Sequence, residues 1–357
     1  MKLLIQPEDG IAPLVDAIKK AKKSIDLVIF RFDRAEIEAG LKAAAKRGVQ
    51  VTALITHANQ GGEKSLRKLE MRLLEAGVTV SRTSDDLVRY HDKMMIIDRR
   101  VLYVMAFNFT HLDIDHSRSF AIVIKKTNLV EEALKLLQAD NDRTKYEAGE
   151  DDFVVSPVNA RKQLLELIER AEKELLIYDP KIADSEMLRA LNARAKHGVD
   201  VKIIGSLGRK SPRLHLRALA GFRLHTRTII RDRCEAFVGS QSLRKAELNA
   251  RREVGVIVRD SKVVRGLTDT FDADWSAKRI EDEAKSTPKE IKRALKATIE
   301  KLSPLDPLVK EAIEEVVSKT DGSATLNTQE MKQTVEKAVK EAVRERVQEM
   351  LSETVDQ

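Results

Sequence analysis

The sequence predicts an α/β fold of two similar domains followed by a helical extension. Short apolar segments of strand type alternate with amphipathic helical segments up to about residue 271, which predicts sheets covered by helices on both faces. The segment Ala-Lys-Arg-Gly-Val-Gln-Val at 45–51 returns as Ala-Lys-His-Gly-Val-Asp-Val at 195–201, which indicates a duplicated domain. Beyond about residue 280 only helical patterns remain. We therefore expect domains at 1–150 and 151–280 and an extension at 281–357.

The first half begins with an alternation of helices and strands. Gly48 and Gly77 follow two of the helices, in the position where glycine commonly ends a helix. The expected elements, in order, are a helix at 11–23, a strand at 24–32, a helix at 34–47, a strand at 49–55, a helix at 63–76 and a strand at 78–81.

The second half repeats this order, but it is shorter. Gly48 and Gly198 are 150 positions apart, whereas His91 and His225 are 134 apart, so 16 residues are missing around 205–216. Its expected elements are a helix at 161–173, a strand at 174–178, a helix at 186–197 and a strand at 199–204. Each half then ends with a strand and a helix, at 120–124 and 128–139 in the first and at 254–258 and 261–271 in the second.

A polar motif introduces the last strands of the first half. Residues 90–98 read Tyr-His-Asp-Lys-Met-Met-Ile-Ile-Asp, with His91 and Lys93 two positions apart, so that both point to one face of an extended strand. Asp98 ends this apolar run, and a second apolar run at 101–108 ends on Asn108. The pair predicts a hairpin that holds His91, Lys93 and Asn108 together near one sheet edge.

These three side chains suit phosphoryl transfer. Imidazole can attack phosphorus, while an ammonium and an amide can bind the non-bridging oxygens. One copy of the motif is weak evidence, because average composition produces it in about 2–3% of chains of this length. A surface histidine and lysine at the start of a strand would explain one copy equally well.

A second copy strengthens the hypothesis. Residues 224–232 repeat the spacing with His225, with Arg227 in place of Lys93, and with Asp232. An apolar strand and the small polar turn Gly239-Ser240-Gln241-Ser242 follow. The chain here resembles the phospholipase D superfamily, whose hallmark is His-x-Lys-x4-Asp followed by Gly-Ser-x-Asn, usually twice per active site.

The resemblance covers about residues 1–280 and departs from the family pattern in both halves. The first copy has Met105-Ala106 in place of Gly-Ser, and the second has Arg227 in place of lysine and Ser242 in place of asparagine. It implies two α-β-α sandwich domains packed face to face, with His91 and His225 meeting across one cleft.

The resemblance also implies roles for individual residues. His91 would be the nucleophile, since its copy keeps both Lys93 and Asn108, and His225 would be the general acid. No metal or cofactor is expected, because cations and polar side chains neutralise the phosphoryl oxygens. These groups are Lys93, Arg227, Asn108 and Ser242, with Ser240 beside them. Asp98 and Asp232 are expected to support the site from behind or to form turns, rather than to carry protons.

One acidic position differs between the halves. Glu253 occupies the place where family members carry an acid that orients a histidine, whereas the first half has Ser119 there. One histidine would therefore lack its carboxylate, unless Asp113 or Asp115 substitutes.

Three functions stay open from sequence alone. The first is a metal-independent phosphodiesterase that hydrolyses or transfers phospholipid head groups, and the second is a nuclease of the same superfamily. The third is a weakly active or inactive phosphate-binding or scaffold protein, suggested by the degenerate second motif. A net charge of +7 favours an anionic partner, while 4% aromatic residues offer few platforms for stacking bases.

Bulk features suggest a cytoplasmic protein with at most peripheral membrane contact. The single cysteine, Cys234, allows no internal disulfide and is expected to be buried in a turn. No window approaches the roughly 18 apolar residues of a membrane span, and the apolar stretch in 1–10 is too short for a signal peptide. Helices expected at 288–302, 307–318 and 329–352 could pair two copies of the chain.

Overall fold

Two mixed sheets with the same strand order build the described part of the chain. The computed structural model describes residues 1–56 and 63–277, with only the backbone described for 63–65. The helices expected in 281–357, and the homodimer proposed through them, lie outside the described residues. Everything below concerns the compact unit Met1–Asp282.

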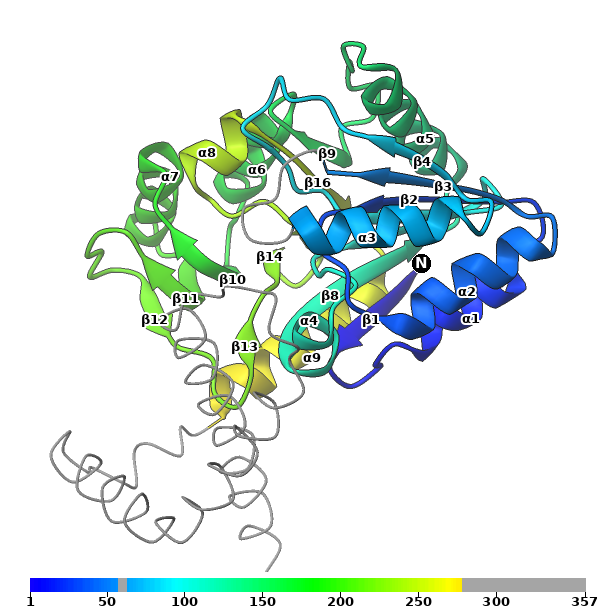
Figure 1. The fold of residues 1–357 in the computed structure, drawn as a ribbon. Helices are drawn as coiled ribbons and strands as arrows, with labels where there is room; N and C mark the ends of the chain where they lie inside the picture. Colours follow the sequence, from blue (N-terminus) through cyan, green and yellow to red (C-terminus); the bar gives the residue numbers. More distant parts are fainter. Residues whose placement is uncertain (57–62, 278–357) are drawn as a thin grey trace, which may run out of the picture. The chain divides into compact units, whose positions relative to one another are not determined.

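Strand order repeats from the first half to the second (Figure 1). The first sheet runs β1 (Lys2–Gln6), β8 (Ser117–Ile124), β7 (Val101–Met105), β6 (Met94–Ile97), β2 (Ser24–Ile29), β3 (Gln50–Ile55) and β4 (Thr79–Arg82). The second runs β9 (Phe153–Ser156), β16 (Arg251–Val258), β15 (Glu235–Gly239), β14 (Arg227–Arg231), β10 (Glu174–Ile182), β11 (Asp200–Leu207) and β12 (His215–Arg217). In each sheet the last three strands are parallel and the others antiparallel.

The helices repeat as well, with one exception. The first half has α1 (Ala12–Lys20), α2 (Ala35–Lys46), α3 (Glu63–Leu74), α4 (His111–Asp115) and α5 (Thr127–Asp142). The second has α6 (Ala160–Glu169), α7 (Ser185–Lys196), α8 (Lys245–Asn249) and α9 (Ser261–Ser276). Within the described residues the second half has no counterpart of α3, which accounts for its shorter sequence.

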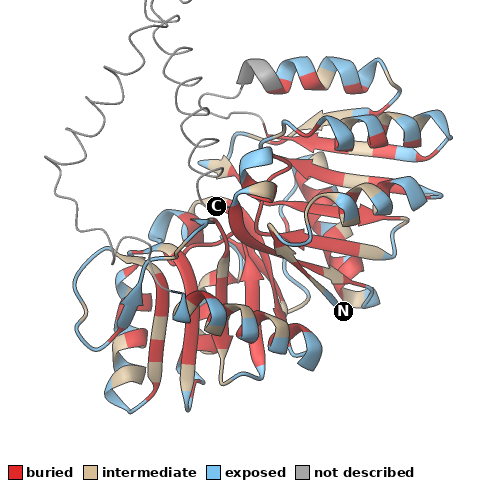
Figure 2. Cartoon of the chain, turned by 90° about the horizontal axis from the view of Figure 1, so that it is seen from below, coloured by how far each residue is buried: buried red, intermediate tan, exposed pale blue. Residues whose placement is uncertain are grey.

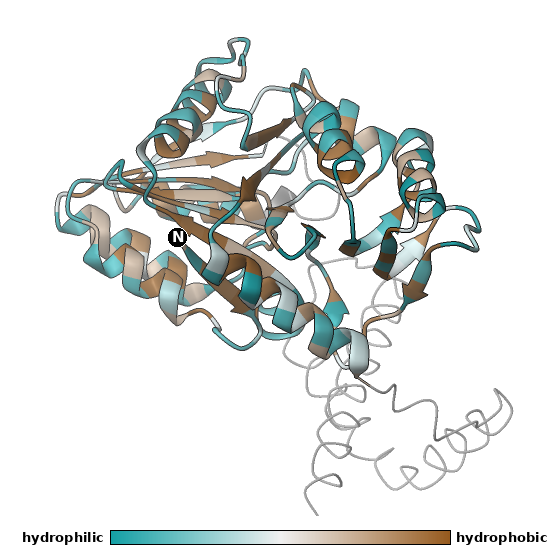
Figure 3. Ribbon diagram, turned by 180° about the vertical axis from the view of Figure 1, so that it is seen from behind, coloured by the Kyte–Doolittle hydropathy of each residue, from teal (hydrophilic) through white to brown (hydrophobic). Residues whose placement is uncertain are grey.

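Side chains alternate along each central strand between two cores. In β6, Met94 and Ile96 face a core shared by both sheets and by α5 and α9, whereas Met95 and Ile97 face the core under α1 and α2. Figure 2 shows the central strands almost wholly buried while the helices keep an exposed face, and Figure 3 shows the matching hydropathy pattern. The shared core fixes the two halves against each other.

The halves also exchange short strands. β5 (Arg89–Tyr90) leads into the first motif yet pairs with β16 of the second half, and β13 (Arg223–Leu224) leads into the second motif yet pairs with β8 of the first. The backbone N–H groups of both motif histidines therefore bond across the junction, from His91 to the Arg252 carbonyl at 2.8 Å and from His225 to the Arg118 carbonyl at 3.2 Å.

Two sequence expectations need correction. His91 and Lys93 lie just before β6 rather than in a strand, because their segment has turned to meet the other half. Cys234 is exposed in the β14–β15 turn rather than buried, because that hairpin projects beyond the core. Among residues 1–56 and 63–277, no helix combines the length and apolar character needed to cross a membrane.

Candidate active site

His91 is held by a carboxylate from the other half. Its Nδ1 lies 2.8 Å from the Glu253 carboxylate, which β16 carries, and its ring meets the edge of Phe30 with 4.5 Å between ring centroids. The His91 side chain is 11% exposed, and Glu253 is fully buried. An ionised carboxylate only accepts hydrogen bonds, so it fixes the proton on Nδ1 and leaves the Nε2 lone pair free.

Burial and positive charge set the protonation of this pair. Burial lowers the pKa of His91 well below its usual value, and the charges of Lys93 and Arg227 act in the same direction. The imidazole is therefore neutral near pH 7 and competent as a nucleophile. Burial also raises the pKa of Glu253 to about 7, against the opposing charge of Lys93.

Each motif cation binds the backbone of its own histidine. The Lys93 ammonium donates to the His91 carbonyl, and Arg227 donates to the His225 carbonyl at 2.6 Å. Arg227 also donates through Nε to the Ser242 hydroxyl at 3.1 Å. Burial lowers the pKa of Lys93 to about 8, so the lysine still carries its charge at neutral pH. The site thus places the buried Lys93 and the half-buried Arg227 beside two neutral histidines.

The surroundings of His225 differ from those of His91. Ser119 stands where Glu253 stands in the other half, and within the described residues neither its hydroxyl nor His225 Nδ1 has a hydrogen-bond partner. The Asp113 carboxylate lies 3.5 Å from His225 Nε2. Burial lowers the pKa of His225 well below its usual value, and Asp113 opposes that shift. Of the two candidate substitutes, Asp113 lies beside this histidine, whereas Asp115 pairs with Arg34.

Asp113 also organises the turn after the first hairpin. It accepts hydrogen bonds from the Asn108 backbone at 2.8 Å and from the Asn108 amide at 2.6 Å. Glu247 does the same in the second half, where it accepts from the Ser242 backbone at 2.8 Å. Ser240 is buried, and its hydroxyl bonds the Val254 backbone beside Glu253. These residues shape the site from behind.

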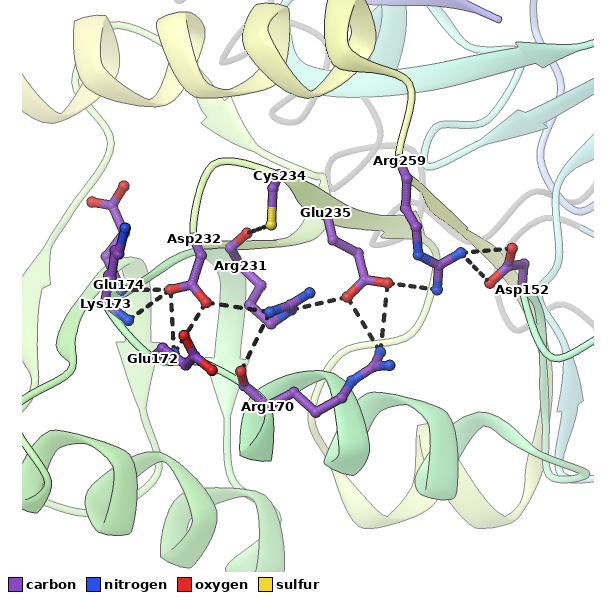
Figure 4. A network of polar contacts seen from close by, with 10 residues as sticks. All are labelled: Asp152, Arg170, Glu172, Lys173, Glu174, Arg231, Asp232, Cys234, Glu235 and Arg259. Atoms are coloured by element: carbon purple, nitrogen blue, oxygen red, sulfur yellow. Dashed lines mark hydrogen bonds and ion pairs between the residues drawn. The ribbon is translucent and has the colours of Figure 1, made fainter.

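The motif aspartates lie elsewhere. Asp98 and Asp232 occupy the hairpin turns at left-handed backbone angles, with φ of 53° and 49°. The Asp232 carboxylate accepts backbone N–H groups of 172–174 (Figure 4), and Asp98 accepts those of 22–24. At about 3.3 Å per residue, Asp232 lies roughly 20 Å along the chain from His225. These two aspartates stabilise turns rather than border the phosphate site.

Sequence reasoning missed a pair of buried ion pairs behind the site. Arg252 binds Asp140 of α5 at 2.9 Å, and Arg118 binds Asp274 of α9 at 2.8 Å. Arg252 directly precedes Glu253 on β16, and Arg118 directly precedes Ser119 on β8. Each ion pair therefore anchors the strand that carries one of these two equivalent positions. The sequence did contain a signal for these ion pairs. The 134-residue spacing between the two motif histidines also separates Arg118 from Arg252 and Asp140 from Asp274.

Comparison with known proteins identifies the family. A family model described as a cardiolipin synthase, phospholipase D-like domain matches residues 14–141 and again 164–275. The chain belongs to this phospholipase D-like family. The resemblance noted in the sequence and the fold of two phospholipase D-like domains are therefore confirmed, while the exact domain boundaries and the role of each site residue stay predictions.

Two curated relatives of this phospholipase D-like chain are enzymes. Mouse mitochondrial cardiolipin hydrolase is 28% identical over 143 residues, which is 39% of this chain and 62% of that protein. A polyphosphate kinase of Pseudomonas aeruginosa is 24% identical over 256 residues, which is 63% of this chain and 37% of that protein. The chain thus spans less than two thirds of the length of either relative.

Two solved structures share the fold. A polyphosphate kinase from Porphyromonas gingivalis superposes with a TM-score of 0.65 at 18% identity, covering 76% of this chain and 46% of that one. Phosphatidylserine synthase from Haemophilus influenzae superposes with a TM-score of 0.61 at 10% identity, covering 85% and 93%. At these identities the likeness concerns the arrangement of elements alone.

Proposed function

We propose that this chain is a metal-independent phosphodiesterase that works through a phosphohistidine and acts on phospholipids by head-group hydrolysis or transfer. The observation that carries the proposal is the bond from His91 Nδ1 to Glu253 of the other half, with Lys93 and Arg227 alongside. It leaves a neutral imidazole with a free Nε2 next to two cations, which is what attack on a phosphodiester requires.

The first step transfers the phosphoryl group to the protein. His91 Nε2 attacks phosphorus, the bond from phosphorus to the leaving oxygen breaks, and that oxygen takes a proton from His225. Lys93, Arg227, Asn108 and Ser242 bind the phosphoryl oxygens. His225 is neutral in the free protein, so the negative charge of the arriving phosphate, together with Asp113, has to favour its protonation.

The second step releases the product. His225, now neutral, takes a proton from water or an alcohol, whose oxygen attacks phosphorus as the bond to His91 breaks. Water gives hydrolysis and an alcohol gives transfer. His225 takes up one proton when the substrate binds, gives it to the leaving oxygen, regains one from the water or alcohol, and releases it when the product leaves, so the cycle balances.

The family supports a phospholipid as substrate. Its model is described as a cardiolipin synthase domain, and one relative is named a cardiolipin hydrolase. Such a substrate would require peripheral contact with a membrane surface. Vesicles of anionic lipid, compared with single- and double-stranded DNA at several salt concentrations, distinguish this reaction from the nuclease alternative.

A second candidate function is phosphoryl transfer to or from polyphosphate. The specific observation is that a polyphosphate kinase aligns over 256 residues of this chain, nearly twice the length of the match to the cardiolipin hydrolase. The chemistry at His91 would be the same, except that the leaving oxygen belongs to a phosphoanhydride. Incubation with tripolyphosphate and a nucleoside diphosphate, followed by assay for the triphosphate, distinguishes this reaction from diester cleavage.

The deciding experiment measures hydrolysis of a chromogenic phosphodiester with and without EDTA. We expect EDTA-resistant turnover that falls by about 10³-fold or more in His91→Ala. His197→Ala, which removes an exposed histidine at the end of α7, is the matched control and should match wild type. Turnover that survives His91→Ala would refute the mechanism, and its absence in wild type would favour the binding-protein alternative.

Mass spectrometry without acid tests the assignment of roles. The proposal places a covalent phosphoryl adduct on His91. An adduct found on His225 would reverse the roles of the two histidines.

A further inference from the structure

Three cations surround one buried aromatic ring beside His91. The Phe30 ring centroid lies 5.4 Å from the Lys93 ammonium, 5.5 Å from the Arg89 guanidinium and 5.7 Å from that of Arg31. Phe30 is 3% exposed and contacts the His91 ring. The ring therefore fixes these positive charges next to the proposed nucleophile.

Two of these cations are not neutralised. Within the described residues, neither Arg31, which is exposed, nor Arg89, which is half-buried, forms an ion pair with a carboxylate. Burial lowers the pKa of Arg89 and the charges of Arg251 and Arg31 lower it further, against the smaller opposing effects of Glu253 and Glu247. Like charges held this close repel one another, and a bound anion would relieve that repulsion.

The second half neutralises the position that corresponds to Arg89. Arg223 stands 134 residues after Arg89 and leads into the second motif in the same way, but it binds Asp113 at 2.7 Å and the Ser117 hydroxyl at 3.1 Å. Pro180 and Lys181 stand 150 residues after Phe30 and Arg31, so no aromatic ring gathers cations there. Within the described residues, the cluster of cations around an aromatic ring therefore lies on the His91 side.

Lys93 and Arg227 already suffice for one phosphodiester, which carries a single negative charge. Cation–π contact is worth about 0.5–1 kcal/mol at exposed sites and explains where the arginines rest, but not why no described carboxylate forms an ion pair with either of them. We infer that Arg31 and Arg89, seated on Phe30, form an anion subsite that binds a second phosphate of the substrate, next to the phosphate attacked by His91. This inference rests on the proposed function and narrows its substrate class.

Calorimetric binding tests the subsite without turnover. Wild type, Arg31→Gln, Arg89→Gln and the double variant are titrated with inorganic phosphate and with methylenediphosphonate, which carries two phosphorus groups and resists hydrolysis. Arg265→Gln is the matched control, because it removes one exposed positive charge on α9, near the hairpin turns. Circular dichroism shows that each variant is folded.

We expect wild type to bind the diphosphonate at least about tenfold more tightly than phosphate, since each charge-assisted contact contributes strongly. The double variant should lose that preference, and Arg265→Gln should keep it. A wild type without the preference, or a double variant that retains it, would overturn the inference.

Substrate pairs then identify the source of the second phosphate. One pair is a glycerophospholipid with one phosphate and one with two, and the other is a dinucleotide with and without a 5′-phosphate. The double variant should lose about 10–100-fold in kcat/KM on the two-phosphate member of the pair that is turned over, and little on the other member. Equal loss on both members, or loss on neither, would reject the subsite. If wild type cleaves nothing, the proposed function fails, and calorimetry alone then decides whether the anion subsite exists.

Discussion

The buried Glu253 carboxylate beside His91 should lower the free energy of unfolding at neutral and alkaline pH. Burial raises the pKa of this carboxyl from 4.5 to about 7. Between these values the folded state binds more protons than the unfolded state, so the free energy of unfolding falls as pH rises through the window. Above pH 7 the full cost applies, about 3 kcal/mol at 1.36 kcal/mol per pKa unit.

Glu253→Gln removes the charge and keeps the shape. The amide oxygen of glutamine can still accept the His91 Nδ1 proton, so we expect the variant to be more stable than wild type by about 1–3 kcal/mol at pH 8.5. The difference should shrink towards pH 5, where Glu253 is protonated in the folded protein. Activity should fall, because a neutral amide stabilises the charged imidazole less than a carboxylate does.

Urea unfolding followed by circular dichroism at pH 5 and pH 8.5 measures the effect. Glu235→Gln is the contrasting control, because Glu235 is equally buried but binds Arg231 at 2.9 Å, Arg170 at 3.2 Å and Arg259 at 2.5 Å (Figure 4). Its loss removes one carboxylate from three partly exposed arginines, two of which keep an aspartate, and should destabilise the protein by about 1–3 kcal/mol. A Glu253→Gln variant less stable than wild type at pH 8.5, or a gain independent of pH, would refute the reasoning.

Three other substitutions have defined outcomes. Activity should decline as pH rises through about 8, where Lys93 loses its proton. Lys93→Arg should keep the enzyme active above pH 9, because guanidinium stays charged there. A wild-type activity profile that is flat to pH 10 would contradict this. Asp113→Asn should lower kcat about 10–100-fold and move the pH optimum down, because His225 then holds its proton less firmly. Adding Ser119→Glu should restore both kcat and the optimum. An unshifted optimum would show that Asp113 does not favour the protonated form of His225. Asp232→Ala should lower the free energy of unfolding by about 1–3 kcal/mol and leave kcat/KM within about twofold, whereas a large loss of activity would place this aspartate in the site.

The fold was predictable because its signals are local and duplicated. The segment around Gly48 returns around Gly198, and the apolar runs of β6 and β14 mark buried strands in both halves. The two motifs marked His91 and His225, whose backbones bond across the junction of the halves, while their meeting in one cleft stays a prediction. The length difference between the halves pointed to the missing counterpart of α3.

Long-range pairings were beyond sequence reasoning. β5 and β13 have two residues each, too few to show a periodic pattern, and both pair with strands of the other half. The spacing of Glu253 from each motif does not say that it bonds His91 rather than His225. Asp98 and Asp232 were expected behind the site or in turns, and left-handed backbone angles together with hydrogen bonds from backbone N–H groups place both in the hairpin turns. Contacts of this kind join segments that are far apart in the sequence and are defined only once the chain has folded.

The exchange of β5 and β13 has a consequence for how this protein could diverge. Neither half builds a finished site, since each supplies the strand on which the other's histidine rests. A single half would have to associate with a second copy of itself, and two-fold symmetry would then impose every substitution on both positions. Covalent fusion removes that constraint: one position holds Ser119 and its equivalent holds Glu253, so two halves with one architecture are free to specialise as donor and acceptor of the proton.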